Sequence, residues 1–261
     1  MAVRVWQVTT FAAEPFRGNP AFVVGLEEDL PLPTLCALAG QFGGVLAVLG
    51  PDAGDPVRLR FVTPSGPHPG AGHAAAAAAE MVLDGRASAE VRFEDGSLRR
   101  FSRDAASRVV VPWPAMPATV NGLGQVLGRA LGQLPTDCLI APFGYVAVYP
   151  DEAAVRGLAP DMAALAALDR DAVIATAPGA PGISDIAIRV FAPKVGLPED
   201  PVCGTAHRII APFWAERLGR PDLHSRHHSP RGGDLWCRSE GDTVTIAGAT
   251  CRVLEGRLLL S

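Results

Sequence analysis

The sequence lacks the features by which proteins bind nucleic acid or cross a membrane. Its 261 residues carry a formal net charge of −4 and contain no basic patch with interleaved aromatic residues, which argues against a nucleic-acid partner. No apolar run is long enough to span a bilayer. The N-terminus, MAVRVWQVTTFAAEPFRG, has no charged leader followed by an apolar stretch. We therefore expect a cytoplasmic protein with no membrane partner.

The sequence also contains no pattern that predicts disulfide bonds or a metal site. The five cysteines are an odd number and are widely and irregularly spaced, so they encode neither a disulfide framework nor a zinc knuckle. The stretch HSRHHSPR, from His224 to Arg231, brings three histidines and two arginines together. No acidic or cysteine ligand follows at a supporting spacing. We expect no metal there and interpret the stretch as a solvated loop, with an anion site as the alternative.

What the chain does contain is typical of a folded protein with a sizeable core and many turns. Hydrophobic residues make up 48% and charged residues 19%, with 28 glycines and 24 prolines. The segment PWPAMP marks a boundary near Pro114. Each half reads as strands, a loop ending in Gly-His or Gly-Thr, one helix and more strands. This pattern predicts two domains, residues 1–114 and 115–250.

Two central helices are the clearest elements. The run HAAAAAAEMVL predicts a helix over residues 73–83, and its small side chains indicate that strands wrap closely around it. The stretch EDPVCGTAHRIIAPFWAERL, residues 199–218, predicts a second helix that opens at Gly204 or Thr205. Because proline lacks an N–H group, we expect Pro212 to kink this helix and shorten its regular part.

The start of the second helix has the composition of a binding site. The first N–H groups of a helix have no intrahelical partners and lie at the positive end of its dipole, which suits a carboxylate or phosphate. Thr205 can cap the helix or bind a ligand. The alternative is that Asp200, Pro201 and Thr205 merely start a helix, as these residue types often do. Spacing alone does not decide between the two interpretations.

Four stretches resemble the PhzF-like isomerases, relatives of diaminopimelate epimerase. They are FAAEPFRGNPAFVV, FVTPSGPHPGAGHAAAAAAEMVL, EDPVCGTAHRIIAPFWAERLG and IAGATCRVLEGRL, and they follow the family's order over almost the whole chain. The resemblance implies an α+β fold of two similar domains, each an antiparallel barrel-like sheet rolled around a central helix. It also implies an active site in the cleft between the domains, a last strand at about residues 251–261 that returns to the first domain, and a homodimer.

The resemblance further implies a reaction, the shift of a proton on a carbon near a carboxylate, without a cofactor. The epimerases use two thiols, one before each helix, and the matching positions here are Ala71 and Cys203, so a two-thiol racemase is excluded. The PhzF-like isomerases use a Glu from a SETAF-like strand. The segment GGVLA aligns with it and places Gly44 where that Glu should stand. No acidic residue occurs between Asp29 and Asp52.

Candidate site residues follow from the motifs that match. In place of the missing Glu, the base is expected to be Asp200, His73 or Cys203. A helix start lowers a thiol's pKa, whereas burial raises it. Residues expected to bind a small carboxylate substrate are Gly72, Gly204, Thr205, Asn19 and Arg231. Asn19 lies in a GNP step that is alternatively a simple turn.

Three functions stay open at this point. The protein is an isomerase or epimerase with a substituted base, it performs a different reaction on a similar acid, or it is a non-catalytic relative that binds a ligand or a partner protein.

Overall fold

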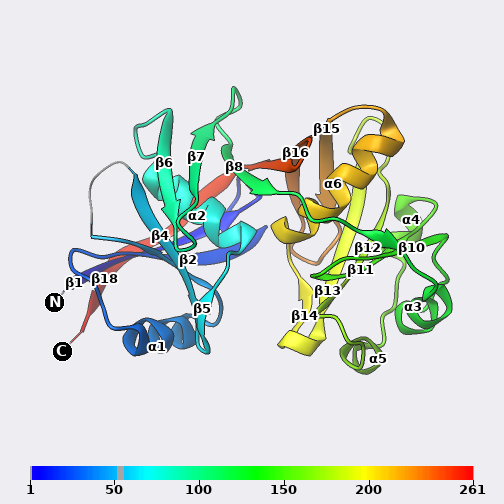
Figure 1. The fold of residues 1–261 in the computed structure, drawn as a ribbon, viewed down its shortest axis with the longest axis horizontal. Helices are drawn as coiled ribbons and strands as arrows, with labels where there is room; N and C mark the ends of the chain where they lie inside the picture. Colours follow the sequence, from blue (N-terminus) through cyan, green and yellow to red (C-terminus); the bar gives the residue numbers. More distant parts are fainter. Residues whose placement is uncertain (1, 52–55, 261) are drawn as a thin grey trace. The chain divides into compact units, whose positions relative to one another are not determined.

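The computed structural model describes residues 2–51 and 56–260, and the chain divides into two compact units (Figure 1). Unit 1 comprises Met1–Pro112 and Ala247–Ser261, and unit 2 comprises Trp113–Ile246. Met1 and Ser261, at the outer ends of the predicted domain ranges, lie outside the described residues. The C-terminal segment belongs to unit 1 because its strand pairs with the first strand of the chain along nearly its whole length.

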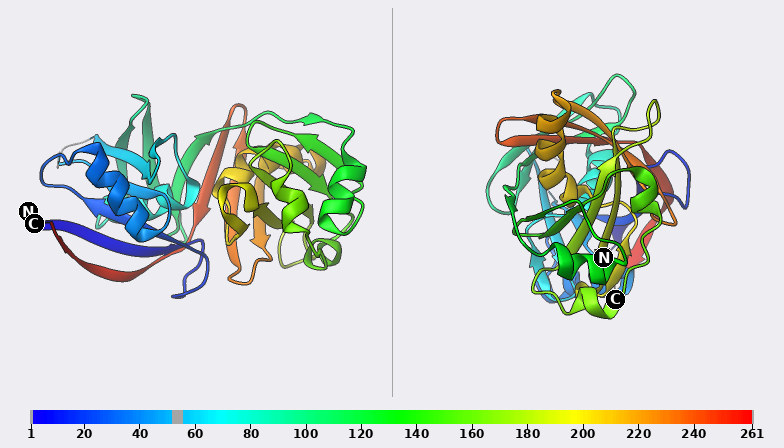
Figure 2. Two further views of the ribbon diagram at one scale, coloured as in Figure 1. Left: turned by 90° about the horizontal axis from the view of Figure 1, so that it is seen from below. Right: turned by 90° about the vertical axis from the view of Figure 1, so that its right-hand side faces the viewer.

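Unit 1 is a sheet that encloses the helix predicted at residues 73–83. That helix, α2 (Gly72–Val82), has six successive alanines, each 3% exposed or less, and it contacts strands β1 to β4 and β18 (Figures 1 and 2). The prediction of a helix closely wrapped by strands is confirmed. The other elements of unit 1 are β1 (Ala2–Thr10), β2 (Asn19–Gly25), α1 (Leu32–Phe42), β3 (Leu46–Leu49), β4 (Val57–Thr63), β5 (Gly66–His68), β6 (Ser88–Phe93), β7 (Leu98–Arg103), β8 (Val109–Pro114), which ends in unit 2, and β18 (Thr250–Leu259).

Unit 2 places its long helix, α6 (Gly204–Leu218), after a similar series of strands. Its short helices α3 and α4 were not among the elements predicted from the sequence. The other elements of unit 2 are β9 (Thr119–Val120), α3 (Gly124–Leu131), β10 (Asp137–Ile140), β11 (Gly144–Val148), α4 (Glu152–Arg156), α5 (Met162–Ala166), β12 (Ala172–Pro178), β13 (Ile186–Ala192), the 3-10 turn η1 (Pro193–Val195), β14 (Leu197–Asp200), β15 (Asp222–His227), β16 (Gly233–Glu240) and β17 (Thr243–Gly248), which ends in unit 1.

The two units share a topology, and their sheets are mixed rather than wholly antiparallel. Most strand pairs are antiparallel, but β2–β3 and β4–β6 in unit 1, and β11–β12 and β13–β15 in unit 2, are parallel. Parallel neighbours need a crossover connection, and helices fill these connections in both units. The α+β class with two similar units is confirmed. The predicted antiparallel sheets also contain these four parallel pairs, because a helix in the connection between two neighbouring strands allows them to run in the same direction.

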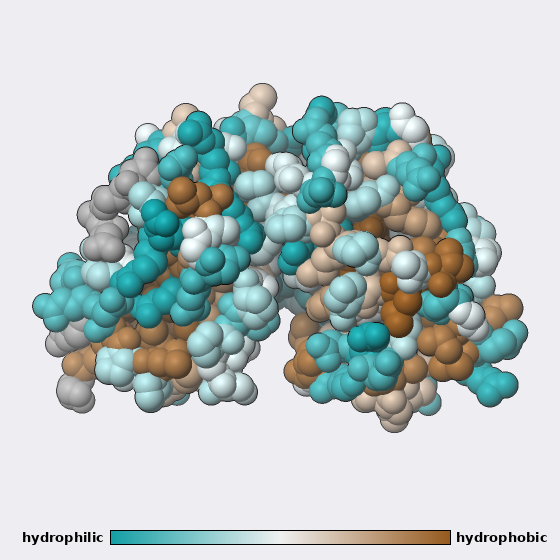
Figure 3. Space-filling model, in the orientation of Figure 1, coloured by the Kyte–Doolittle hydropathy of each residue, from teal (hydrophilic) through white to brown (hydrophobic). Residues whose placement is uncertain are grey.

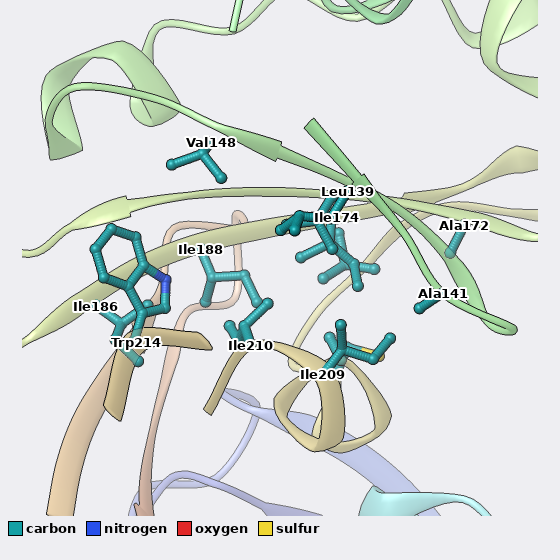
Figure 4. Packing of buried hydrophobic residues seen from close by; sticks show 14 of the residues in the cluster. Leu139, Ala141, Val148, Ala172, Ile174, Ile186, Ile188, Ile209, Ile210 and Trp214 are labelled. Atoms are coloured by element: carbon teal, nitrogen blue, oxygen red, sulfur yellow. The ribbon is translucent and has the colours of Figure 1, made fainter. Parts of the chain in front are cut away.

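Helix α6 packs against one face of the sheet of unit 2. Ile209, Ile210 and Trp214 meet strand residues that include Val148 and Ile174 (Figure 4). Alternate residues of the same strands point to the opposite face, where α3, α4 and α5 cover them. Strands buried on both faces consist of nearly continuous apolar residues. This double burial explains the nearly continuous apolar runs of β11 and β12, in which Thr176 is the polar exception and is hydrogen-bonded.

The expected shortening of the second helix at Pro212 does not occur. α6 continues through Pro212 as one helix of 15 residues. Ile209, Ile210 and Trp214 flank the proline and are almost fully buried. Packing of this apolar face outweighs the one hydrogen bond that proline removes, because tertiary contacts commonly override local propensity.

The stretch that we interpreted as a solvated loop, His224 to Arg231, is a strand in its first half, where β15 ends at His227, so the interpretation was wrong for these residues; the second half is a loop. β15 places Ser225 and His227 in the core, 0% and 1% exposed, while His224 and Arg226 point to the other face. The alternation of inward and outward residues is that of a strand. The alternation was hidden because the inward residues Ser225 and His227 are polar, and each makes a hydrogen bond to a residue distant in the chain.

The surface of unit 2 exposes apolar side chains around α3. Val120, Val126 and Leu134 are 74%, 45% and 56% exposed, and Figure 3 shows hydrophobic groups in this region among hydrophilic ones. Since α3 covers the sheet face opposite α6, these groups take no part in the packing around α6.

Among the described residues, no helix has both the length and the apolar character needed to cross a membrane.

Candidate active site

The predicted site of unit 2 is a short polar segment between β14 and α6. β14 ends at Asp200, and Cys203 stands directly before the helix in an extended conformation, with φ −95° and ψ 98°. Gly204 and Thr205 are the first two residues of the helix, so Thr205 lies beyond the capping position. The N–H groups of such a first turn point away from the helix body and suit a carboxylate.

Asp200 is half-buried and accepts two hydrogen bonds. The N–H of Val202 donates to Oδ1 at 3.1 Å, and the thiol of Cys203 also donates to the carboxyl. Burial raises the pKa of Asp200 to about 6, against the lowering effect of these two bonds. A carboxylate with a pKa near neutrality is a suitable general base. These hydrogen bonds come from residues before the helix, so Asp200 is not the capping residue of α6, which is Cys203.

Cys203 is a neutral thiol at physiological pH. Its side chain is 4% exposed, and burial, followed by the negative charge of Asp200, raises its pKa well above the usual value. The N–H groups at the helix start act in the opposite direction but do not prevail. The thiol is therefore better suited to donate a hydrogen bond to Asp200 than to act as the base.

A bidentate ion pair holds β14 against β13, one residue before Asp200. The guanidinium of Arg189 donates from Nε to Oε1 of Glu199 at 2.8 Å and from Nη2 to Oε2 at 3.1 Å. The two side chains are 13% and 14% exposed. Arg189 also donates from Nη1 to the carbonyl of Leu158 at 3.0 Å. This network fixes the strand that carries the candidate base.

Arg231 lies in the loop between β15 and β16, which is tied to the same segment. The hydroxyl of Ser229 donates to the carbonyl of Pro201 at 2.6 Å and accepts the N–H of Gly232 at 3.1 Å. The fold of unit 2 thus brings the loop of Arg231 next to the segment that precedes α6. Long-range pairing of this kind leaves no local signal in the sequence.

In unit 1 the corresponding helix start belongs to α2. Ala71 precedes the helix, and Gly72 and His73 are its first two residues. Burial, followed by the nearby His68, lowers the pKa of His73 to about 4, so its imidazole is neutral at pH 7. The Nδ1 atom of His68 accepts the N–H of Gly70 at 3.1 Å. A neutral imidazole of this kind can donate a hydrogen bond or exchange a proton.

Asn19 and Gly44 occupy other parts of unit 1. Asn19 is 6% exposed and is the first residue of β2, where its carbonyl accepts the hydroxyl of Thr10 at 3.0 Å. Its place in a strand disfavours the simple turn. Gly44 is exposed between α1 and β3, and a Cβ atom added there would meet nothing within 4 Å. The glycine is therefore not required by close packing.

Sequence analysis missed three polar residues next to the Cys203 backbone. They are His207, Ser225 and His227, all buried in unit 2. His207 follows Cys203 by four residues, which places the two on one face of a helix, and this spacing was the available signal. Ser225 and His227 come from β15, so only the tertiary fold could identify them.

Comparison with known proteins identifies the family. Residues 127–256 match a family described as phenazine biosynthesis-like protein. An uncharacterized isomerase of Pseudomonas aeruginosa is 37% identical over the full length of both chains. The chain belongs to the PhzF-like family. A second uncharacterized isomerase of that organism is 36% identical, also over both full lengths, and the human phenazine biosynthesis-like domain-containing protein is 28% identical over 99% of each chain.

Solved structures agree with this PhzF-like assignment. A PhzF-family phenazine biosynthesis protein of Enterococcus faecalis superposes with a TM-score of 0.90 at 29% identity, covering all of both chains. A hydroxyproline epimerase of Agrobacterium vitis has a TM-score of 0.60 at 12% identity, covering 98% of this chain and 91% of its own, which shows the shared fold alone. The implied relationship to epimerase-like folds is confirmed.

Proposed function

We propose that this PhzF-like protein is a cofactor-independent isomerase that moves a proton on a carbon near the carboxylate of a small metabolite. The observation that carries the proposal is the half-buried Asp200, whose pKa is raised to about 6 directly before the start of α6. Two relatives that match over their full length are named isomerases, which supports the same class. We further propose that it acts as a homodimer in a biosynthetic pathway.

The proposed reaction has two proton transfers. Asp200 accepts the proton from the substrate carbon, and the electrons of that C–H bond move toward the carboxyl end of the substrate. The N–H groups of Gly204 and Thr205 and the hydroxyl of Thr205 stabilise the negative charge that develops there. For a double-bond shift, protonated Asp200 gives its proton to a carbon further along the double bond; for inversion, the ring N–H of His73 gives a proton to the other face of the same carbon, and proton exchange with water then restores both groups. We propose neutral His73 as the second proton-transferring group, and Asn19 and Arg231 as substrate ligands.

The test is exchange of carbon-bound protons in deuterated water. The protein is incubated with a panel of small carboxylic acids, including unsaturated and hydroxy acids, and deuterium uptake is followed by proton NMR and mass spectrometry. Uptake at one carbon near the carboxylate, with formation of an isomer, supports the proposal. Binding of these acids without any uptake contradicts it.

A binding protein without catalytic activity is the second candidate, and Gly44 favours it. This glycine stands where the family resemblance implies a catalytic Glu. Such a protein would bind a carboxylate at the start of α6 or a partner protein, with no turnover. Saturable binding in calorimetry together with a complete absence of exchange supports this candidate, and detectable turnover excludes it.

The exchange rate is expected to depend on pH through Asp200. Since the carboxyl must be ionised to accept a proton and its pKa is about 6, the rate should rise about tenfold per pH unit below pH 6 and level off above it. Initial exchange rates measured between pH 4.5 and 8 show this rise, the acid limb of the pH profile. A rate that is constant from pH 5 to pH 7 would contradict the role of Asp200.

Two substitutions of Cys203 distinguish a role as hydrogen-bond donor to Asp200 from a role as the base. Cys203→Ser keeps a donor next to Asp200, so the rate is expected to stay within about tenfold of the wild type. Cys203→Ala removes the bond that lowers the pKa of Asp200, so the acid limb should move to higher pH while exchange persists. Loss of exchange in both variants at every pH would instead identify Cys203 as the base.

A further inference from the structure

Three buried polar side chains surround the backbone of Cys203 in unit 2. His207, on the first turns of α6, is 0% exposed, and Ser225 and His227 of β15 are 0% and 1% exposed. The surrounding core is otherwise made mainly of aliphatic and aromatic side chains. Burying three polar groups costs free energy that apolar residues would not cost.

The bonds of the cluster hold both polar groups of the Cys203 backbone. The carbonyl of Cys203 accepts a hydrogen bond from Nδ1 of His207 at 2.8 Å, so the proton of that imidazole is on Nδ1. The Nε2 atom of His207 then accepts the hydroxyl of Ser225, also at 2.8 Å. On the other side, the N–H of Cys203 donates to Nε2 of His227 at 3.3 Å.

The same bonds link the cluster to the candidate base. The thiol of Cys203 and the N–H of Val202 both donate to Asp200. A shift of the Cys203 backbone would therefore change both hydrogen bonds of the carboxyl and turn the first N–H groups of α6. His227 itself keeps an Nδ1 atom with no hydrogen-bond partner among residues 2–51 and 56–260. A cluster selected for stability alone would not leave that donor unpaired.

We propose that His207, Ser225 and His227 are positioning residues that hold the Cys203 backbone, and through it the Asp200 carboxyl and the first turn of α6, in the geometry of proton transfer. The expected effect of these residues on the reaction rate rests on the proposed function, whereas their expected effect on the pKa of Asp200 does not. The three side chains face the Cys203 backbone and act on the reaction only through it.

Paired variants test the clamp formed by His207, Ser225 and His227. His227→Leu removes the acceptor for the Cys203 N–H, whereas His227→Gln keeps an oxygen near the place of Nε2. His207→Leu removes the donor to the Cys203 carbonyl, whereas His207→Asn keeps an N–H near the place of Nδ1. The control is Thr176→Val, which leaves the Nε1 donor of Trp214 on α6 unpaired without touching Cys203.

Two readouts distinguish positioning from folding. The pKa of Asp200 is followed by carbon-13 NMR of its side-chain carboxyl, assigned with Asp200→Asn, and does not depend on activity. Both leucine variants should raise this pKa by about one unit as the bonds to the carboxyl weaken. They should also lower kcat about 100-fold with little change in KM. The Gln and Asn variants and the Thr176→Val control should stay close to the wild type in both readouts.

The outcomes separate the clamp from the proposed function. Folded leucine variants with an unchanged Asp200 pKa overturn the clamp, whatever the activity. If wild type shows no exchange while the leucine variants still shift the pKa, the clamp stands and the proposed function fails. If the leucine variants do not fold, Ser225→Ala provides the test, because it removes only the hydrogen bond between the Ser225 hydroxyl and Nε2 of His207. An unchanged Asp200 pKa in Ser225→Ala overturns the proposal.

Discussion

Asp200→Asn is expected to lower the rate of carbon-bound proton exchange by about 10²- to 10⁴-fold, the usual contribution of a general base. Asparagine has nearly the shape of aspartate but cannot accept the proton. Its side-chain oxygen can still receive the N–H of Val202, which lies 3.1 Å from Oδ1 in the native protein. The variant should therefore keep its fold and its substrate affinity, so the loss should appear in kcat.

The same substitution is expected to stabilise the protein at neutral pH. The pKa of Asp200 is about 6 in the folded protein, above the ordinary 3.8. Stability from the protonated carboxyl is thus complete below pH 3.8 and is lost as the pH rises through 6. A difference of two pKa units corresponds to about 3 kcal/mol at pH 7. Urea unfolding should show Asp200→Asn to be more stable than wild type at pH 7 and about equal near pH 4.

Asp151→Asn is the matched control for the loss of one carboxylate. Asp151 caps α4 by accepting the N–H of Ala154 at 2.8 Å, and asparagine caps helices equally well. Neither exchange nor stability should change in this variant. If Asp200→Asn keeps the wild-type exchange rate, Asp200 is not the base. His73→Ala then tests the other candidate, since loss of exchange in that variant would assign the base to unit 1.

Arg189→Leu is expected to lower the free energy of unfolding by about 3 kcal/mol, because it removes the ionic partner of the Glu199 carboxylate, which has little access to water. The two side chains are only 13% and 14% exposed. The variant also loses the bond from Arg189 to the carbonyl of Leu158. Since Glu199 directly precedes Asp200 on β14, exchange should fall as well. Urea unfolding and exchange assays measure the two effects.

A double variant tests whether the cost arises from the unpaired charge. Arg189→Leu with Glu199→Leu removes both charges, and it should be more stable than Arg189→Leu alone. Arg100→Leu is the control, since Arg100 and its partner Glu90 are 70% and 46% exposed. Exposed pairs contribute less than about 1 kcal/mol. Equal losses for Arg189→Leu and Arg100→Leu would show that the buried pair has no special role.

Local chemistry made part of the site predictable. The start of α6 was expected at Gly204 or Thr205, and the helix begins at Gly204. The direction in which the pKa values of Asp200 and Cys203 shift could not be predicted from the sequence. For the thiol, a helix start lowers the pKa and burial raises it. Burial prevails, and the pKa of Cys203 rises. Burial depends on residues that are distant in the chain, such as those of β15.

The repeated order of elements, the alanine-rich helix and the family motifs were predictable from the sequence alone, and the α+β class followed from the family resemblance that those motifs carry. These features are encoded within short windows, through periodicity, propensity and the residue types at helix starts. The tertiary structure was needed to show that α6 continues through Pro212, that the first half of HSRHHSPR belongs to strand β15, and that Ser225 and His227 of this strand join His207 around Cys203. Packing and long-range hydrogen bonds determine these features, and neither is recorded in any local stretch of the chain.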